Sequence, residues 1–199
     1  LVELAIQATG IVAYSLRDSY PPEKLRRRPI RARVVGARFL DSIEGTTKPK
    51  LQWWKWDGAG DPGGARGHWG WIPKSCLLGS DWTKAYSEKY RVLTLADGGT
   101  IQFNSYDQEV EKQAGTSKHL VVFDELPPRA HYIENQMRVM DTGGQLILSM
   151  TPPTEASGIS AAWVYDALYE PGMGGHADID AFEFFTEDMR YLSQEGIRR

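Results

Sequence analysis

The sequence predicts an α/β fold with a mostly parallel β-sheet flanked by helices. Residues 30–37, 119–123 and 145–150 each contain a short run of apolar, strand-forming residues, and segments with helical periodicity lie between them. Apolar strands that alternate with helices are typical of a parallel sheet covered on both faces. A chain of 199 residues, 41% of them hydrophobic, is long enough for one domain with a real core.

The chain opens with a predicted helix, "LVELAIQATGIVAYSL", at residues 1–16. Its apolar residues recur at the spacing of one helix face: Leu1, Leu4, Ala5, Ala8, Val12 and Leu16. No capping residue precedes this pattern, and the first residue is not Met. We therefore expect a fragment of a longer protein that is truncated on its N-terminal side.

Residues 30–37 are the first expected strand, and "RFLDSIE" at residues 38–44 is a short helix after it. Residues 45–80 are rich in Gly and Pro and contain five of the seven tryptophans, which predicts a long insertion held by its aromatic side chains. In "YRVLTLADGGTIQFNSYD", the alternation around Asp97-Gly98-Gly99 predicts a β-hairpin, because glycine supplies the positive φ of the turn.

The second half continues the alternation of strand and helix. The strand at residues 119–123 precedes a helix, "RAHYIENQMRVM", which Gly143 or Gly144 can close in the left-handed conformation. An apolar strand at residues 145–150 follows. The pattern then predicts a helix at "ISAAWVYDALYE", a break at "PGMGGHAD" and a last strand at "IDAFEFF", residues 179–185.

Composition excludes several classes of protein. A net charge of -3 argues against a surface that binds polyanions everywhere, although five arginines crowd one stretch: Arg26, Arg27, Arg28, Arg31 and Arg33. A single cysteine, Cys76, excludes an intrachain disulfide and favours a reducing setting. No apolar run approaches the roughly 20 residues of a membrane span, so no membrane association is expected. His68 and Cys76 are too few ligands for a zinc site.

The strongest functional signal is "HLVVFDEL", where an apolar strand ends in Asp124 and Glu125. Ligands of open α/β sheets bind outside the carboxyl ends of the strands. There, an aspartate can hold Mg²⁺ through a water, and a neighbouring glutamate can take a proton from a water that attacks a phosphate. The alternative is a loop that starts with two solvated carboxylates.

The next strand adds hydroxyl groups, because "LILSMTPP" places Ser149 and Thr151 at its carboxyl end. A right-handed crossover would set this end beside Asp124, where a hydroxyl can contact a γ-phosphate or the attacking water. The alternative is that Ser149 and Thr151 only cap the turn that follows.

The order of these segments resembles a known family. "TLADGGTIQFNSYDQ", "AGTSKHLVVFDE", a helix with Arg138 and "GGQLILSMTPP" together resemble the ATPase domain of the large terminase subunit, the DNA-packaging motor of tailed bacteriophages. The resemblance implies a P-loop NTPase fold of the additional-strand, catalytic-glutamate class. Residues 1–172 would be the ATPase domain with an insertion at residues 45–80, and residues 173–199 the start of a linker toward an absent nuclease domain. Met189 departs from the family pattern in that linker.

The same resemblance implies residue roles. Asp124 would coordinate Mg²⁺, Glu125 would be catalytic, and Ser149 and Thr151 would belong to the motif that couples hydrolysis to movement. The family also uses an arginine to stabilise the transferring phosphate, and here the candidates for phosphate or DNA contact are Arg129, Arg138 and the arginine-rich stretch that includes Arg28. The first strand and the phosphate loop that ends in Gly-Lys-Ser/Thr are absent, so this fragment is expected to be inactive alone.

The implied full protein hydrolyses ATP with Mg²⁺ and moves double-stranded DNA into a procapsid in the host cytoplasm. The implied partners are the portal protein, the small terminase subunit and other copies in a ring. Two alternatives remain at this stage, a helicase-like NTPase and a non-catalytic interaction module that uses the Trp-rich insertion. A metal-dependent nuclease would have to recruit Asp97, Asp107 and Asp178, and their spacing does not favour it. His119 is expected to be structural.

Overall fold

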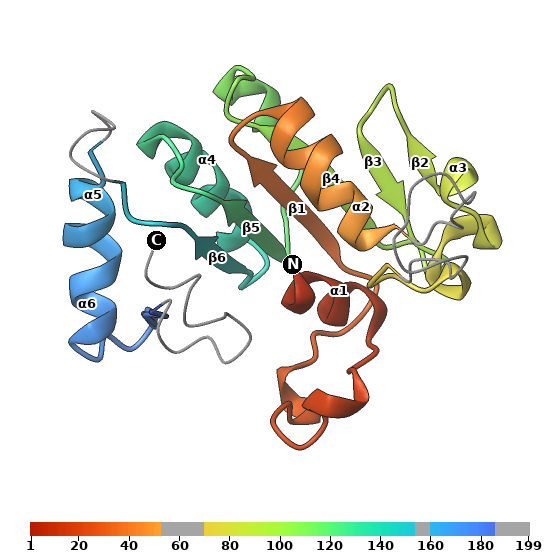
Figure 1. Cartoon of the computed structure of the whole chain (residues 1–199), viewed down its shortest axis with the longest axis horizontal. Helices are drawn as coiled ribbons and strands as arrows, with labels where there is room; N and C mark the ends of the chain where they lie inside the picture. The colour runs from red at the N-terminus through yellow and green to blue at the C-terminus, as the bar shows by residue number, and fades with distance from the viewer. Residues whose placement is uncertain (53–69, 154–159, 186–199) are drawn as a thin grey trace, which may run out of the picture. The chain divides into compact units, whose positions relative to one another are not determined.

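The computed structural model describes residues 1–52, 70–153 and 160–185. The chain divides into two compact units, Leu1–Thr151 and Pro152–Arg199, which we describe separately (Figure 1). Within the described residues, no helix combines the length and the apolar composition needed to cross a membrane.

The first unit is built on one six-stranded sheet with the order β2-β3-β4-β1-β5-β6. Four neighbouring strands, β4, β1, β5 and β6, run parallel, and β2 and β3 add an antiparallel edge. The strands are β1 (Arg31–Gly36), β2 (Tyr86–Ser87), β3 (Val92–Thr94), β4 (Thr100–Ser105), β5 (Leu120–Asp124) and β6 (Gln145–Ser149). The predicted α/β class with a mostly parallel sheet is therefore confirmed.

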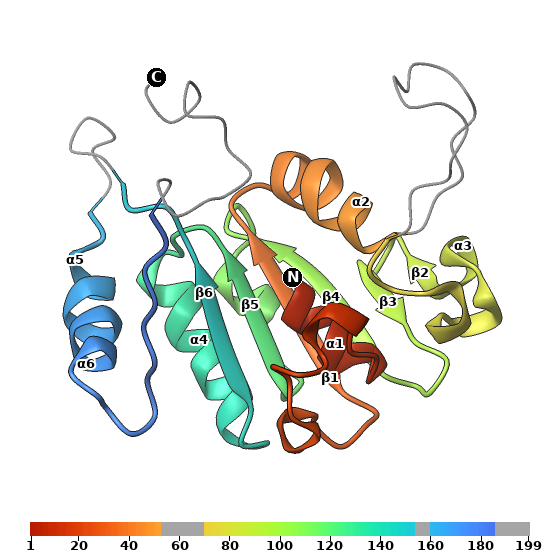
Figure 2. The ribbon, with the colours of Figure 1, turned by 60° about the horizontal axis from the view of Figure 1, so that its bottom comes forward.

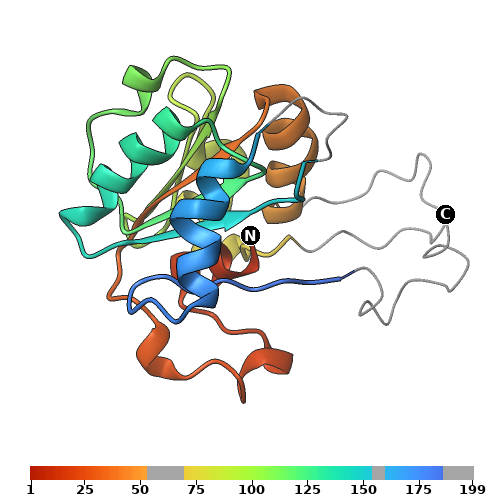
Figure 3. The same ribbon diagram turned by 90° about the vertical axis from the view of Figure 1, so that its left-hand side faces the viewer.

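Helices cover both faces of this sheet (Figure 3). On one face, α1 (Val2–Thr9), η3 (Phe39–Thr47) and α2 (Lys48–Leu51) pack on alternate strand residues such as Val34 and Leu120. On the other face, α4 (Arg129–Met140) packs through Val139 on Val121 and Phe123. Because both faces are covered, β5 is buried from Leu120 through Phe123, which is why its sequence is apolar throughout.

Two helix predictions are wrong in extent. The first helix stops at Thr9, because Gly10 adopts φ 69° and donates its N–H to the Ile6 carbonyl oxygen, so residues 14–16 form only a separate turn, η1. The helix expected at residues 38–44 continues through η3 and α2 to Leu51, so the insertion begins later than residue 45.

Short elements complete the connections: η2 (Pro22–Lys24), η4 (Lys74–Cys76), η5 (Leu78–Ser80), α3 (Trp82–Ala85) and η6 (Val110–Gln113). The core of the Trp-rich insertion, residues 53–69 with His68, lies outside the described residues.

The predicted hairpin is confirmed as β3 and β4, with Gly98 at φ 86° in the turn. After α4, Gly143 takes the left-handed position at φ 56°. Gly144 is needed for close packing, because a Cβ there would lie 2.7 Å from the Lys118 carbonyl oxygen.

In the second unit, α5 (Ala162–Val164), η8 (Tyr165–Tyr169) and α6 (Glu170–Met173) form one helical stretch that ends later than predicted. The last predicted strand, residues 179–185, is wrong: it forms no strand and pairs with none in the described chain. It lies instead against its own helix, where a Cβ at Gly172 would come within 2.8 Å of Ala181 Cβ. Phe182 and Phe184 are left exposed. Residues 186–199, including Met189, lie outside the described residues.

Candidate active site at the carboxyl ends of the parallel strands

The four parallel strands end together in a row of small and polar residues. Ser105 ends β4, Gly36 ends β1, Asp124 ends β5 and Ser149 ends β6. The register pairs Gly36 with both Ser105 and Asp124, and Asp124 with Ser149, so all four lie in one line across the sheet. Cross-strand neighbours in register point to the same face. The structure thus places the Ser149 side chain next to that of Asp124.

The start of α1 lies close to Asp124. Burial lowers the pKa of the Leu1 amino group, and the negative charge of Asp124 raises it, so the two groups lie within electrostatic range of each other. Lys50 of α2 is also in range and lowers this pKa. In Figure 2 the chain start, marked N, lies at the end of α1 that is nearer the strand tips. The positive end of the α1 dipole is therefore directed toward this edge of the sheet.

Glu125 has an unusual backbone conformation, with φ 79°. A residue with a side chain costs about 1–3 kcal/mol in such a conformation and needs support from its surroundings. Two hydrogen bonds provide it here. The Glu125 N–H donates to the Ser149 carbonyl oxygen at 2.8 Å, and the Glu125 carbonyl oxygen accepts from the Tyr106 hydroxyl at 2.8 Å. The Glu125 side chain itself is exposed to solvent.

Tyr106 is the support for Glu125 that sequence reasoning missed. Its ring lies 5.6 Å from the His131 ring and 6.5 Å from the Phe123 ring, between centroids. Burial raises its pKa, and the charges of Asp124 and Glu125 raise it further, so the hydroxyl keeps its proton and remains a donor. The only sequence signal is an aromatic residue immediately after β4.

Gly36 is a second contributor that the sequence did not reveal. A Cβ at this position would lie 2.7 Å from Ser42 Cβ and 3.2 Å from Ile43 Cδ1. The glycine therefore allows η3 to pack directly over the end of β1 beside Asp124.

The remaining predicted site residues divide between the two ends of the sheet. Thr151 and Arg129 are exposed, and both follow strand ends at the Asp124 edge, Thr151 after β6 and Arg129 as the first residue of α4. Arg138 lies in the last turn of α4, 3.0 Å from Glu134.

Arg28 also lies away from this edge. It donates to the Thr9 carbonyl oxygen at 2.6 Å, at the C-terminal end of α1, and pairs with Asp97 at 3.0 Å. The structure therefore brings neither Arg138 nor Arg28 to Asp124 within one chain. Arg129 is the arginine of the three that lies at the same edge.

Among the residues that the structure describes, no three or more His, Cys, Asp or Glu side chains are grouped closely enough to hold a metal ion. Mg²⁺ commonly takes one or two carboxylates and completes its shell with water and substrate phosphates. A single carboxylate at Asp124 fits that pattern. Within the first unit the nuclease alternative is not supported, because Asp97 and Asp107 lie beyond opposite ends of β4. Asp178 is a residue of the second unit.

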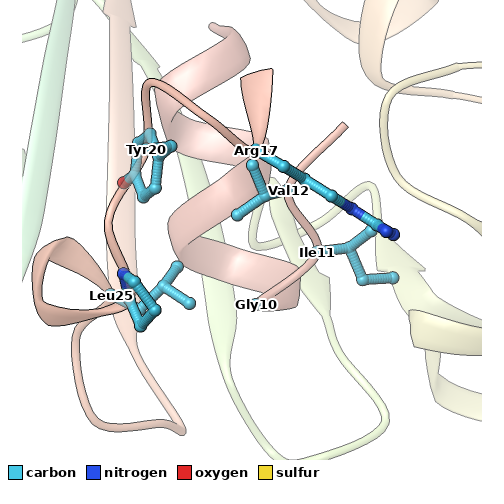
Figure 4. Close-up of a pocket in the computed structure, with 7 residues that line it drawn as sticks. Gly10, Ile11, Val12, Arg17, Tyr20 and Leu25 are labelled. Atoms are coloured by element: carbon cyan, nitrogen blue, oxygen red, sulfur yellow. The ribbon is translucent and has the colours of Figure 1, made fainter. Parts of the chain in front are cut away.

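A cavity of about 460 Å³ lies elsewhere, in the loop after α1 (Figure 4). Ile11, Val12 and Arg17 lie on one side of it, and Tyr20 and Leu25 lie across from them. It is at the C-terminal end of α1, whereas Asp124 is near the beginning of α1. It contains no carboxylate and is separate from the candidate site.

Comparisons with family models, with curated proteins and with solved structures found no match to this chain.

Proposed function

We propose that this chain is the ATPase domain of a viral DNA-packaging motor of the large terminase subunit type. The observation that carries the proposal is the alignment of Asp124 with Ser149 at the strand tips, beside the beginning of α1. A carboxylate, a hydroxyl and a helix N-terminus are the groups that a magnesium–nucleotide complex requires.

The proposed chemistry assigns one task to each group. Asp124 holds Mg²⁺ through water, and Glu125, which is exposed and fixed through its backbone, takes the proton of the attacking water. Ser149 and Thr151 contact the γ-phosphate or that water and transmit its loss to the following segment. The positive end of the α1 dipole favours the phosphates.

The edge of β6 supports the finer assignment to the P-loop class. Two backbone hydrogen bonds join β6 to β5: the Gln145 N–H donates to the His119 carbonyl oxygen, and the Glu125 N–H donates to the Ser149 carbonyl oxygen. In a parallel pair, every second residue of a strand bonds to the same neighbour, so the N–H and C=O groups of Leu146 and Leu148 point away from β5. Within the described residues no strand pairs with that edge, and Leu146 through Leu148 are only half-buried.

One more parallel strand would satisfy this edge. If it precedes Leu1, as the proposed class requires, the loop that joins it to α1 passes beside Asp124. The phosphate loop would lie in that connection. The portal protein, the small terminase subunit, a ring of copies and the host cytoplasm belong to the same proposal. Nothing in the described residues favours the helicase-like or the non-catalytic alternative.

The test uses the complete gene product that includes this chain. Glu125→Gln is expected to lower kcat for magnesium-dependent ATP hydrolysis by about 10²–10⁴-fold, the usual contribution of a general base, with nucleotide binding retained. Glu109→Gln is the matched control, because Glu109 is exposed and, among the described residues, its carboxylate pairs only with Lys112, at 3.2 Å. Equal turnover of the wild-type and Glu125→Gln proteins would refute the proposal.

A further inference from the structure

The amino ends of the parallel strands carry positive charge that the candidate active site does not use. Arg31 begins β1, and Lys118 and His119 directly precede β5. Arg26 reaches the same place, because its guanidinium donates to the carbonyl oxygen of Gly143, just before β6, at 3.0 Å. We call the cations Arg26, Arg31 and Lys118, together with the neutral His119 beside them, whose pKa is lowered by burial and by the charges of Arg31 and Arg26, the amino-end cation cluster.

Hydrogen bonds fix the backbone and the imidazole of this cluster. The Arg31 N–H donates to Nδ1 of His119 at 3.0 Å, so the neutral imidazole carries its proton on Nε2 as a further donor. The Lys118 N–H donates to the Arg138 carbonyl oxygen at 2.7 Å, and the Thr142 hydroxyl donates to the Lys118 carbonyl oxygen. The cluster therefore sits on a rigid part of the fold.

Two cations at this end of the sheet are buried, Arg33 next to the cluster and Lys118 within it. Arg33 on β1 is 1% exposed, and its guanidinium donates only to neutral acceptors, on Gln102, Gln113 and Asn135. Lys118 is 4% exposed, and its ammonium donates to the Thr116 hydroxyl at 2.8 Å. Burial lowers the pKa of Lys118 to about 8, and the charges of Arg33 and Arg31 contribute to the lowering.

Nearby carboxylates balance this charge only in part: burial lowers the pKa of Arg33, and the charge of Glu134 offsets a part of that lowering. Glu134 lies 3.0 Å from Arg138, and Asp141 accepts from the Ser117 hydroxyl at 2.9 Å. Within the described residues, no carboxylate forms an ion pair with Arg33 or with any member of the cluster. Buried cations without an acidic partner destabilise a fold, so an anion bound at this surface would lower the free energy of the whole group.

We propose that the amino-end cation cluster binds the phosphate backbone of duplex DNA. The Arg31 side chain is exposed and makes no hydrogen bond or ion pair within the described residues, so its donors are available. The surface is also open, because nothing lies within 4 Å of the position of a Cβ at Gly115 or Gly143. An extended polyanion needs no cavity, since its phosphates can contact several donors in turn.

An acidic protein is the less suitable partner. Stable protein interfaces have an apolar centre, whereas Thr116, Gly143 and Gln145 beside the cluster are polar or lack a side chain. The cluster is at the opposite ends of the strands from Asp124, so its binding does not require ATP hydrolysis. The inference takes duplex DNA as the polyanion from the proposed motor function, and it adds to that function the surface that contacts the DNA.

The test is a titration of the 199-residue chain with a short fluorescent DNA duplex at several salt concentrations, without nucleotide. The double variant Arg26→Gln with Arg31→Gln is expected to weaken binding by roughly tenfold for each arginine and to lower the slope of log affinity against log salt by about 2. The single variant Arg31→Gln controls for a folding defect, because the Arg31 side chain makes no hydrogen bond or ion pair within the described residues. This variant should show half of the change in slope.

The matched control is Arg38→Gln with Lys89→Gln, which removes the same charge beyond the carboxyl end of β1 and in the β2–β3 turn. It should leave the slope unchanged. An equal loss in the control would overturn the proposal, as would the absence of salt-dependent binding by the wild type. Polyglutamate that competes as well as DNA would also overturn it in favour of an acidic protein partner. Because no nucleotide is present, none of these outcomes depends on whether the chain belongs to an ATPase.

Discussion

Replacing Glu125 by glycine is expected to stabilise the fold, although this residue is the proposed catalytic base. Its φ of 79° is one that glycine adopts without strain and that other residues adopt at a cost of roughly 1–2 kcal/mol. The glycine variant loses about 0.5–1 kcal/mol of this stabilisation, because glycine gives the unfolded chain more conformational freedom. The net expectation is a rise of about 1 kcal/mol in the free energy of unfolding.

Side-chain effects need to be separated from the backbone effect. The Glu125 carboxylate is exposed, and Asp124 next to it carries the same charge, so loss of the charge could itself be stabilising. Glu125→Gln measures that contribution, and Glu125→Ala removes the side chain but keeps the Cβ. We expect the Glu125→Gly variant to have a free energy of unfolding about 1 kcal/mol higher than that of the Glu125→Ala variant.

The matched control is Gln136, an exposed residue within α4. There the order should reverse, because glycine is about 1 kcal/mol less favourable than alanine inside a helix. Urea unfolding of the chain, followed by circular dichroism, measures all of these variants. If alanine were more stable than glycine at position 125 as well, the left-handed conformation would not exist in solution, and the account of how Glu125 is fixed would fail.

Three further changes test other parts of the structure. Lys118→Met should raise the free energy of unfolding at pH 7 by up to about 3 kcal/mol, since the pKa of Lys118 in the folded state is lowered from 10.5 to about 8. The folded protein binds the Lys118 proton less tightly than the unfolded chain does, so the gain is full below pH 8 and disappears as the pH rises through 10.5. Urea unfolding that gives equal gains at pH 7 and pH 10 would contradict this reasoning. Tyr106→Phe should lower the free energy of unfolding by about 1 kcal/mol, because the hydrogen bond from Tyr106 to Glu125 is lost. In the full-length protein the same change should lower kcat and leave KM unchanged. Steady-state kinetics with an unaltered kcat would exclude a role for Tyr106 in positioning Glu125. Gly36→Ala should destabilise the fold by about 1–3 kcal/mol, and part of this stability should return when Ser42 is also changed to Gly. If thermal unfolding shows that the second change restores no stability, the contact with Ser42 is not the cause.

Sequence periodicity predicted the centre of the sheet well, for a physical reason. β5 is covered on both faces and is therefore apolar from Leu120 to Phe123, whereas β6, at the end of the strand order, is only half-buried and is visible through its central Leu and Ile residues. Between them, α4 was predicted with the bounds that the structure has, Arg129–Met140. The right-handed crossover rule also predicted that Ser149 lies beside Asp124, and the register of β5 and β6 pairs these two residues.

Features that depend on partners distant in the sequence were not predictable. The apolar spacing of the first helix continues past Gly10, but spacing does not reveal that this glycine adopts a left-handed conformation. Residues 179–185 have the composition of a strand, but no strand of the described part of the chain pairs with them. Tyr106 and Gly36 contribute to the site only through contacts with residues on other elements, and a sequence pattern contains no record of such contacts.

The arginine-rich stretch shows the same limit. In the sequence it is one patch, yet Arg33 is buried, Arg28 is paired with Asp97, and Arg31 is exposed. Arg31 and Arg33 lie on the same face of β1, but Arg31 is at the exposed start of the strand, whereas Arg33 is covered by η6 and α4 through Gln113 and Asn135. A run of like charges in the sequence therefore does not define a surface. The cation cluster combines Arg26 and Arg31 of this stretch with Lys118 and His119, and only the fold brings these two segments together.

A series of polar contacts, buried between Arg33 and His131, leads from β1 to the exposed Glu125 at the carboxyl ends of the strands. Its members, in order, are Arg33, Asn135, Gln113, His131, Tyr106 and Glu125. The three side-chain bonds from Arg33 to His131 measure 2.7, 2.8 and 2.8 Å, the His131 and Tyr106 rings are in contact, and the Tyr106 hydroxyl reaches Glu125. Such contiguity transmits a signal only if some element has two arrangements. Here the bonds hold α4 against the sheet in one arrangement, and a buried network with its partners in place resists rearrangement. We therefore expect the sheet and α4 to act as a rigid frame for Glu125, and any movement coupled to hydrolysis to arise in the segment that follows Thr151.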